Sequence, residues 1–122
     1  MDRGAHFVIG LVVFFIYNFI NTSIINSTIN PIFGISAIGI WLIGAFAAAF
    51  GSVIPDQIEP ANHWTHRGTF HSIRALNFTT YCFAITAFIG LFFSPSFYIA
   101  SFFLGYMFHL LVDSKTKVGL PR

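Results

Sequence analysis

The stretch "GISAIGIWLIGAFAAAFG", residues 34–51, is a run of apolar and small residues without a single charge. With its apolar neighbours it extends over about residues 32–54, and about 20 such residues suffice for a helix to cross the hydrocarbon core of a bilayer. Small residues let helices approach closely in lipid, and in this run they recur roughly one helical turn apart: Gly34, Gly39, Gly44 and Ala48. The stretch therefore predicts a membrane helix that packs tightly against another helix.

The whole chain shares this apolar character. Of its 122 residues, 56% are hydrophobic and only 8% are charged, whereas soluble domains carry about 25% charged residues. Further apolar runs cover about residues 6–25, 73–93 and 97–113, and Pro95 suits the first turn of the last helix. No small-residue cleavage site follows the first run, so we expect a retained helix rather than a signal peptide. The sequence predicts an all-α polytopic membrane protein: one transmembrane domain over residues 1–122, a four-helix bundle whose loop 55–72 carries the polar motif.

The charged residues occupy three segments: before the first predicted helix, between the second and third, and after the fourth. They are Asp2, Arg3, Asp56, Glu59, Arg67, Arg74, Asp113, Lys115, Lys117 and Arg122. With four spans, all three segments lie on the same side, and the positive-inside rule places that side in the cytoplasm. We therefore expect a multi-pass protein of the inner or plasma membrane with both termini cytoplasmic. The net charge of +2 without a basic stripe argues against nucleic-acid binding, and the lipid bilayer is the expected partner.

The histidines follow the charges. His6 begins the first predicted helix, three more lie in the central loop at His63, His66 and His71, and His109 lies near the end of the fourth helix. Ionisable groups at membrane depth are costly, and they usually face the bundle interior or a water-filled cavity. The sequence therefore predicts that imidazoles and carboxylates meet at the cytoplasmic face of the bundle.

The stretch "HLLVD", residues 109–113, places His109 and Asp113 four residues apart. Residues at that spacing share one face of a helix, so the pair can hold one metal ion. In the alternative interpretation His109 hydrogen-bonds a neighbouring helix near the interface, and Asp113 is only a polar helix end.

The stretch "HRGTFH", residues 66–71, has a glycine between two histidines. A turn at this glycine, leading into the third helix, could aim His66 and His71 inward, and the planar fork of Arg67 could bind an anionic group of a substrate. In the alternative interpretation the loop is solvated beside the headgroups, and Arg67 and Arg74 bind lipid phosphate.

The stretch "IPDQIEP", residues 54–60, follows the second apolar run. We expect Pro55 to end the helix, with Asp56 at the water boundary, where a fixed carboxylate could bind a cation. In the alternative interpretation Asp56 is an ordinary polar residue at a helix end.

Four short motifs occur in a familiar order: AH (5–6), PD (55–56), HRGTFHS (66–72) and GYMFHLLVD (105–113), followed by GLP (119–121). This order resembles the YdjM-like family of inner-membrane proteins, to which metal-dependent hydrolysis is ascribed. The resemblance covers most of the chain, and HRG-x-x-HS and GY-x-x-H-x-x-x-D are its specific parts. The family pattern reads PD-x-D followed by His and Pro, whereas here Ile58 replaces the second Asp and Glu59 takes the His position. The polar positions that the resemblance carries over are His6, Asp56, His66, Arg67, His71, His109 and Asp113.

The first functional hypothesis is a metal-dependent hydrolase at the cytoplasmic membrane face, acting on a lipid-like phosphodiester or ester. The expected cofactor is a divalent metal, with zinc as the first choice, because imidazole and carboxylate ligands with one open position activate water. Glu59 or His66 would act as general base, and Arg67 would hold an oxyanion. The expected metal ligands are His6, Asp56, His71, His109 and Asp113.

The second hypothesis is a small non-catalytic membrane subunit. In that case the same cluster would be a structural metal site or a polar contact that holds the helices together for a partner. The sequence leaves open whether such a partner is another copy of this chain or a different protein of a membrane complex.

Overall fold

The computed structural model describes residues 3–25, 37–58, 69–90, 92–93 and 95–115. These ranges form four α-helices and one short 3₁₀ turn, and they contain no strand. The elements are α1 (Arg3–Ile25), α2 (Ala37–Ile58), η1 (Thr69–His71), α3 (Ile73–Gly90) and α4 (Pro95–Ser114). The predicted all-α fold class is therefore confirmed over the described part of the chain, and Pro95 lies in the first turn of α4.

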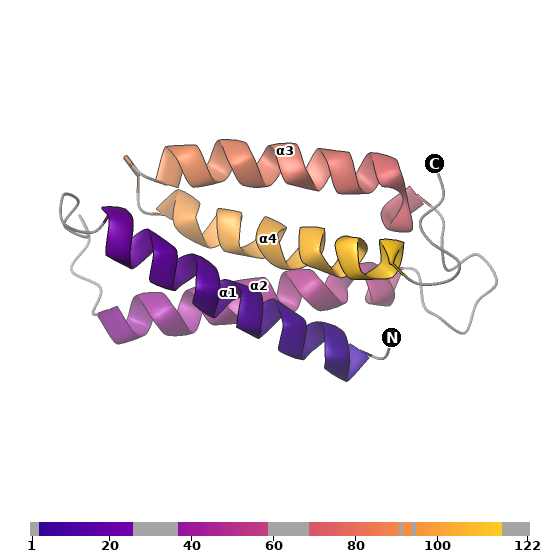
Figure 1. Ribbon diagram of the computed structural model, residues 1–122, viewed down its shortest axis with the longest axis horizontal. Coiled ribbons are helices and arrows are strands. Elements are labelled where there is room, and N and C mark those ends of the chain that lie inside the picture. The colour runs from indigo at the N-terminus through magenta and orange to yellow at the C-terminus, as the bar shows by residue number, and fades with distance from the viewer. Residues whose placement is uncertain (1–2, 26–36, 59–68, 91, 94, 116–122) are drawn as a thin grey trace.

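Helix α4 occupies the centre of the bundle (Figure 1). It lies between α3 on one side and α1 and α2 on the other, and it packs against all three. Helix α1 also packs along α2, whereas α3 packs mainly against α4. Because α4 is surrounded, half of its residues are buried: Ser96, Phe97, Ala100, Ser101, Leu104, Gly105, Tyr106, His109, Leu110 and Asp113. The polar residues near the end of α4 are therefore held inside the bundle.

The end of α2 differs from the sequence-based expectation. Pro55 does not stop the helix, which continues to Ile58 with Pro55 inside it. A proline in a helix removes one backbone hydrogen bond and crowds the carbonyl four residues earlier. Here that earlier residue is Gly51, and only three residues follow the proline, so the cost is limited to the last turn. As a result, Asp56 is a buried helical residue and not a residue at the water boundary. The expected loop 55–72 therefore starts later, and its residues 59–68 lie outside the described ranges.

Glycines let α2 and α4 approach until their backbones touch. A Cβ atom added at Gly105 would collide with the carbonyl oxygen of Ala48 and lie 3.0 Å from the amide nitrogen of Ser52. A Cβ atom added at Gly51 would collide with the backbone of Phe102. In a bilayer such close van der Waals packing, rather than the hydrophobic effect, holds helices together. The α2–α4 contact therefore fixes the distance between the two helices that carry most of the polar cluster described below.

The small residues predicted to pack the second helix against another helix contact two helices, α4 at Ala48 and α1 at Gly44. Ala48 is completely buried, and a Cβ atom added at Gly44 would collide with the ring of Phe14 on α1. Around Phe14, Ala48 and Phe97 the bundle forms its hydrophobic core, where the rings of Tyr17 and Phe97 stack with centroids 5.5 Å apart. Gly34 lies outside the described residues.

The outer surface of the bundle is apolar. Along α3 only Thr79 is buried, and large side chains such as Phe78, Tyr81 and Phe88 face outward. Helices α3 and α4 are each long and apolar enough to cross a membrane, and shorter apolar stretches occupy Gly4–Ile20 and Leu42–Ile58. Contiguous apolar patches of this extent are rare on soluble monomers, so the surface suits a lipid environment.

Hydroxyl groups on the helices are satisfied without water. The hydroxyl of Thr79 donates to the carbonyl of Ala75 (2.9 Å), and that of Thr86 donates to the carbonyl of Cys82 (2.6 Å). Such bonds to the preceding turn are a common way for Ser and Thr to satisfy their hydroxyls inside a helix. Since bilayer hydrocarbon offers no hydrogen-bond partners, this pattern fits the apolar surroundings of α3.

Candidate metal centre

Five polar residues meet at one end of the bundle. The start of α1, the ends of α2 and α4, and η1 all lie at this end, on the right in Figure 1. Each of these elements supplies one imidazole or one carboxylate, except α4, which supplies one of each. All five residues are buried, with at most 5% of their surface exposed. These residues are His6, Asp56, His71, His109 and Asp113. The structure thus brings together every residue that the sequence suggested as a metal ligand.

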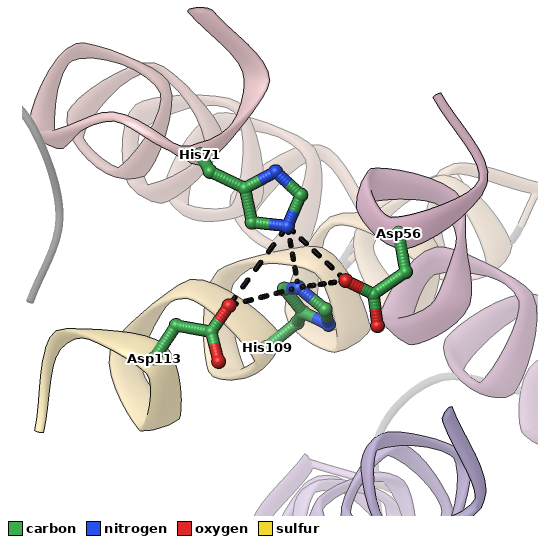
Figure 2. Close-up of side chains that lie close together, drawn as sticks. All are labelled: Asp56, His71, His109 and Asp113. Atoms are coloured by element: carbon green, nitrogen blue, oxygen red, sulfur yellow. Dashed lines mark hydrogen bonds and ion pairs between the residues drawn. The ribbon is translucent and has the colours of Figure 1, made fainter. Parts of the chain in front are cut away.

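The pair on α4 adopts the expected one-turn arrangement. The Nε2 atom of His109 lies 3.4 Å from Oδ2 of Asp113, and both side chains point toward His71 (Figure 2). Ring nitrogen and carboxylate oxygen are therefore close enough to share one small cation.

His71 and Asp56 complete the group from the other side (Figure 2). Nε2 of His71 lies 3.1 Å from Nε2 of His109 and 3.3 Å from Oδ1 of Asp56. It also lies 3.8 Å from Oδ2 of Asp113, and Nε2 of His109 lies 3.6 Å from Oδ1 of Asp56. One donor atom from each of the four residues lies within 4.8 Å of all the others. We call these four residues the His/Asp cluster.

The separations in the His/Asp cluster fit those of ligands around one cation. Metal bonds of about 2.0–2.2 Å in a tetrahedral site place neighbouring ligand atoms about 3.3–3.6 Å apart, and the five separations given above run from 3.1 to 3.8 Å. Two imidazoles and two carboxylates also suit zinc and several other divalent metals. The buried His/Asp cluster could therefore bind a metal ion, and its donor atoms do not select one metal.

A backbone contact fixes the orientation of His109. Its Nδ1 atom lies 2.7 Å from the carbonyl oxygen of Ser52 on α2. A carbonyl can only accept, so Nδ1 carries the hydrogen, and in the neutral ring Nε2 presents its lone pair to the cluster. Metal-binding histidines commonly have this kind of outer partner. The sequence analysis missed Ser52, although it precedes Asp56 by four residues and so shares its helix face.

Two contacts position His71. Ser72 caps α3, because its Oγ accepts the N–H of Ala75 (3.1 Å) while its hydroxyl donates to the carbonyl of Thr69 (2.8 Å). On the other side of His71, the hydroxyl of Tyr106 donates to the carbonyl of Phe70 (3.1 Å). The η1 turn is thus tied both to α3 and to α4. Tyr106 was also missed, although it lies three residues before His109, on the same face of α4.

His6 lies at the edge of the His/Asp cluster. Its Nε2 atom is 3.5 Å from Oδ1 of Asp113 and 4.0 Å from Oδ2 of Asp56. Its ring lies beside that of His109, with centroids 3.8 Å apart and planes tilted by 33°. His6 therefore faces the carboxylate oxygens of Asp56 and Asp113 that do not face His71 and His109.

The remaining residues from the sequence analysis either lie outside the described residues or are exposed. Glu59, His66 and Arg67, suggested for catalysis, lie outside the described residues, as does His63. Ile58, which stands where the family pattern has a second Asp, is 49% exposed at the end of α2. Its side chain is therefore not buried in the His/Asp cluster.

Comparisons with known proteins identify the family. No curated protein and no solved structure matches the chain. The model of the family described as "YdjM inner membrane protein" matches residues 1–122, the full length of the sequence. This match agrees with the resemblance of the short motifs and with the apolar exterior of the bundle. The chain belongs to the YdjM inner membrane protein family.

Proposed function

We propose that this protein is a membrane-embedded metal-dependent hydrolase whose His/Asp cluster holds a divalent cation, with zinc as the first choice. One observation carries the proposal: Asp56, His71, His109 and Asp113 offer four donor atoms at the mutual separations of a coordination sphere, in the interior of the bundle. A cation would explain why α2, η1 and α4 all direct ionisable side chains to one buried point.

Electrostatics supports a cation at this point. The carboxylates of Asp56 and Asp113 are buried, and removing carboxylates from water costs several kcal/mol each unless they are paired. A divalent ion balances both charges, whereas neutral imidazoles balance neither. The Nε2 lone pair of His109, fixed by the bond from Nδ1 to Ser52, also points at the site where such an ion would be held.

A divalent cation in this site would supply Lewis-acid chemistry and make water acidic enough to serve as a nucleophile near neutral pH. The chain would supply the remaining groups from residues 59–68, which connect the end of α2 to η1. Glu59 or His66 would accept the proton of the attacking water, and Arg67 would hold an anionic oxygen of the substrate. These roles rest on the sequence.

The membrane arrangement supports a lipid-like substrate, either a phosphodiester or an ester. We propose that all four helices span the inner membrane, since α1 and α2 also expose large apolar side chains such as Phe19 and Phe46. With the charged segments on the cytoplasmic side, the His/Asp cluster lies at the cytoplasmic end of the bundle. A substrate carried in the inner leaflet would meet the cluster at headgroup level.

One observation favours a second candidate function. His71 and His109 are completely buried, which is typical of a closed structural site and not of one open to substrate. In this alternative the protein is a non-catalytic membrane subunit. The cation would fasten α2, η1 and α4 together, and the apolar face of α3 would contact a partner protein or another copy of the chain.

The experiment measures metal content and hydrolysis on the same detergent-purified samples. Wild type, Asp113→Asn and the control Ser114→Ala are analysed for bound zinc and for cleavage of phosphodiester and ester lipid analogues. The hydrolase hypothesis expects metal and activity in wild type and in Ser114→Ala, with both lost in Asp113→Asn. Metal without cleavage of either substrate class would favour the subunit, and wild type without metal would refute the site.

A further inference from the structure

His6 faces a different oxygen of each carboxylate from the one that faces His71 and His109. Oδ1 of Asp56 and Oδ2 of Asp113 lie among the ring nitrogens of His71 and His109. The second oxygen of each carboxylate, Oδ2 of Asp56 and Oδ1 of Asp113, lies near Nε2 of His6 instead. Each carboxylate therefore presents one oxygen to the His71–His109 side and one to the His6 side. Carboxylates that bridge two cations are arranged in this way.

The arrangement of two imidazoles agrees with such a bridge. The rings of His6 and His109 lie side by side with centroids 3.8 Å apart, and both direct Nε2 toward the same pair of carboxylates. Because the two rings meet different oxygens of the same carboxylates, they are placed to serve one ion each.

Among the residues that the structure describes, the other ring nitrogen of His6 has no hydrogen-bond partner. Nδ1 of His6 is buried and unpaired within the described structure, which costs about 1–3 kcal/mol for a buried polar atom. All polar contacts of this ring are therefore on its Nε2 side, toward Asp56 and Asp113. A buried ring whose Nε2 atom faces two carboxylates is placed to share a cation with them.

The packing of α1 holds His6 in this position. Gly10 follows His6 by one turn, and a Cβ atom added there would lie 2.6 Å from Oγ of Ser52 on α2. The absence of a side chain at Gly10 thus allows the start of α1 to approach the part of α2 that carries Asp56. This close approach of α1 to α2 depends on packing at Gly10 and not on the charges of the His/Asp cluster.

We propose that Asp56 and Asp113 bridge two divalent cations. The first is the ion of the proposed function, on which this inference rests. The second would be held by Nε2 of His6, Oδ2 of Asp56 and Oδ1 of Asp113. It has three protein donors, and Nδ1 of His6 lacks the outer partner that Ser52 provides for His109, so it binds more weakly than the first.

The charge balance indicates the substrate class. Two divalent ions carry four positive charges, against two negative charges on the bridging carboxylates, so two positive charges remain in a buried site. An anionic substrate oxygen lowers this excess, whereas a neutral ester does not. A phosphate ester is therefore the substrate class that the two-cation arrangement favours.

The test counts Mn²⁺ bound to the full chain in detergent and records its electron paramagnetic resonance spectrum. Wild type and the control Val8→Ala, an exposed position on α1, are expected to bind two ions per chain with the spectrum of an exchange-coupled pair. His6→Gln is expected to bind one ion, uncoupled, with the affinity of the tighter site retained. His71→Gln is expected to lose that tighter site.

The outcomes separate this inference from the proposed function. A single ion in saturated wild type, two uncoupled ions, or two coupled ions in His6→Gln would each overturn the bridge. One ion together with hydrolysis would overturn the bridge and leave the hydrolase standing. Two coupled ions without hydrolysis would support the bridge and refute the hydrolase, and wild type without any bound ion would refute both.

Discussion

The imidazole of His109 donates its Nδ1 hydrogen to the backbone carbonyl of Ser52 over 2.7 Å, and so joins α4 to α2. Ser52 lies one turn before Asp56, so a single face of α2 provides both a carboxylate of the His/Asp cluster and the carbonyl that orients an imidazole of that cluster. The distance between the two helices therefore controls the geometry of the candidate metal centre.

Gly105→Ala tests this dependence on helix spacing. The added methyl group collides with the carbonyl oxygen of Ala48, so α2 and α4 must separate, and overpacking of this kind costs about 1–3 kcal/mol. We expect lower thermal stability in detergent and weaker metal binding, because the Ser52 carbonyl moves away from His109. Gly4→Ala, at an exposed position in the first turn of α1, is the control. Unchanged metal affinity in Gly105→Ala would contradict the link.

Tyr106→Phe tests the support of His71. The variant removes only the hydroxyl that donates to the carbonyl of Phe70, and loss of an outer-sphere contact weakens metal binding by about 10–100-fold. We expect a loss near the lower end of that range, with helix content unchanged by circular dichroism. Tyr81→Phe makes the same change on a residue of α3 that is 70% exposed, and it should bind metal as wild type does. Equal affinities in the two variants would show that Tyr106 does not position His71.

Asp113→Asn separates a metal ligand from a polar helix end. The change keeps the size of the side chain and removes its charge, so metal content should fall sharply. Without metal, stability should rise, because one of two neighbouring buried carboxylates is gone. With free metal at 100 times the dissociation constant, wild type gains about 2.7 kcal/mol, and Asp113→Asn should gain almost nothing. Thermal unfolding with and without chelator measures both effects, and identical curves for the two proteins would rule out a metal ligand at this position.

His109→Gln should match Asp113→Asn in its loss of metal. Both residues come from α4 and their donor atoms lie 3.4 Å apart, so either change removes one ligand from the same ion. Elemental analysis after purification measures the loss. If His109→Gln retains as much metal as wild type, His109 serves only the hydrogen bond to Ser52.

Single-cysteine labelling tests the membrane topology. In a Cys82→Ser background, a cysteine replacing Ser27 should react with an impermeant reagent added outside the cell, and one replacing Lys117 should not. The reason is that all charged segments lie on one side of the four predicted spans. The reverse labelling pattern would invert the proposed orientation and place the His/Asp cluster on the outer face.

Much of the candidate site was predictable because ionisable residues are so rare in this chain. His109 and Asp113 are one helical turn apart, and in an apolar sequence such a pair has few places to lie except inside the bundle. The convergence of His71 and Asp56 on this pair followed from their position on the charged side. The same reasoning cannot reveal the Ser52 carbonyl, because every residue has a carbonyl and only tertiary packing selects one.

The errors and omissions in the fold have related causes. Pro55 predicts a helix end, yet the helix continues for three residues because the cost of a proline in a last turn is small and packing buries its ring. Gly105 was not recognised as a contact point, although Ser101 precedes it by four residues and small residues at this spacing let helices approach closely. Its role appears only once Ala48 of α2 is seen against it.

The central position of α4 also has a consequence for biosynthesis. Asp56 and His71 leave the ribosome well before His109 and Asp113, and α4 is the last of the described helices to be made. Until α4 packs between its neighbours, Asp56 and His71 do not face His109 and Asp113, the two residues that complete the His/Asp cluster. A partly synthesised chain therefore lacks the complete His/Asp cluster, and a cation of the proposed function would enter a site that the finished bundle has already shaped.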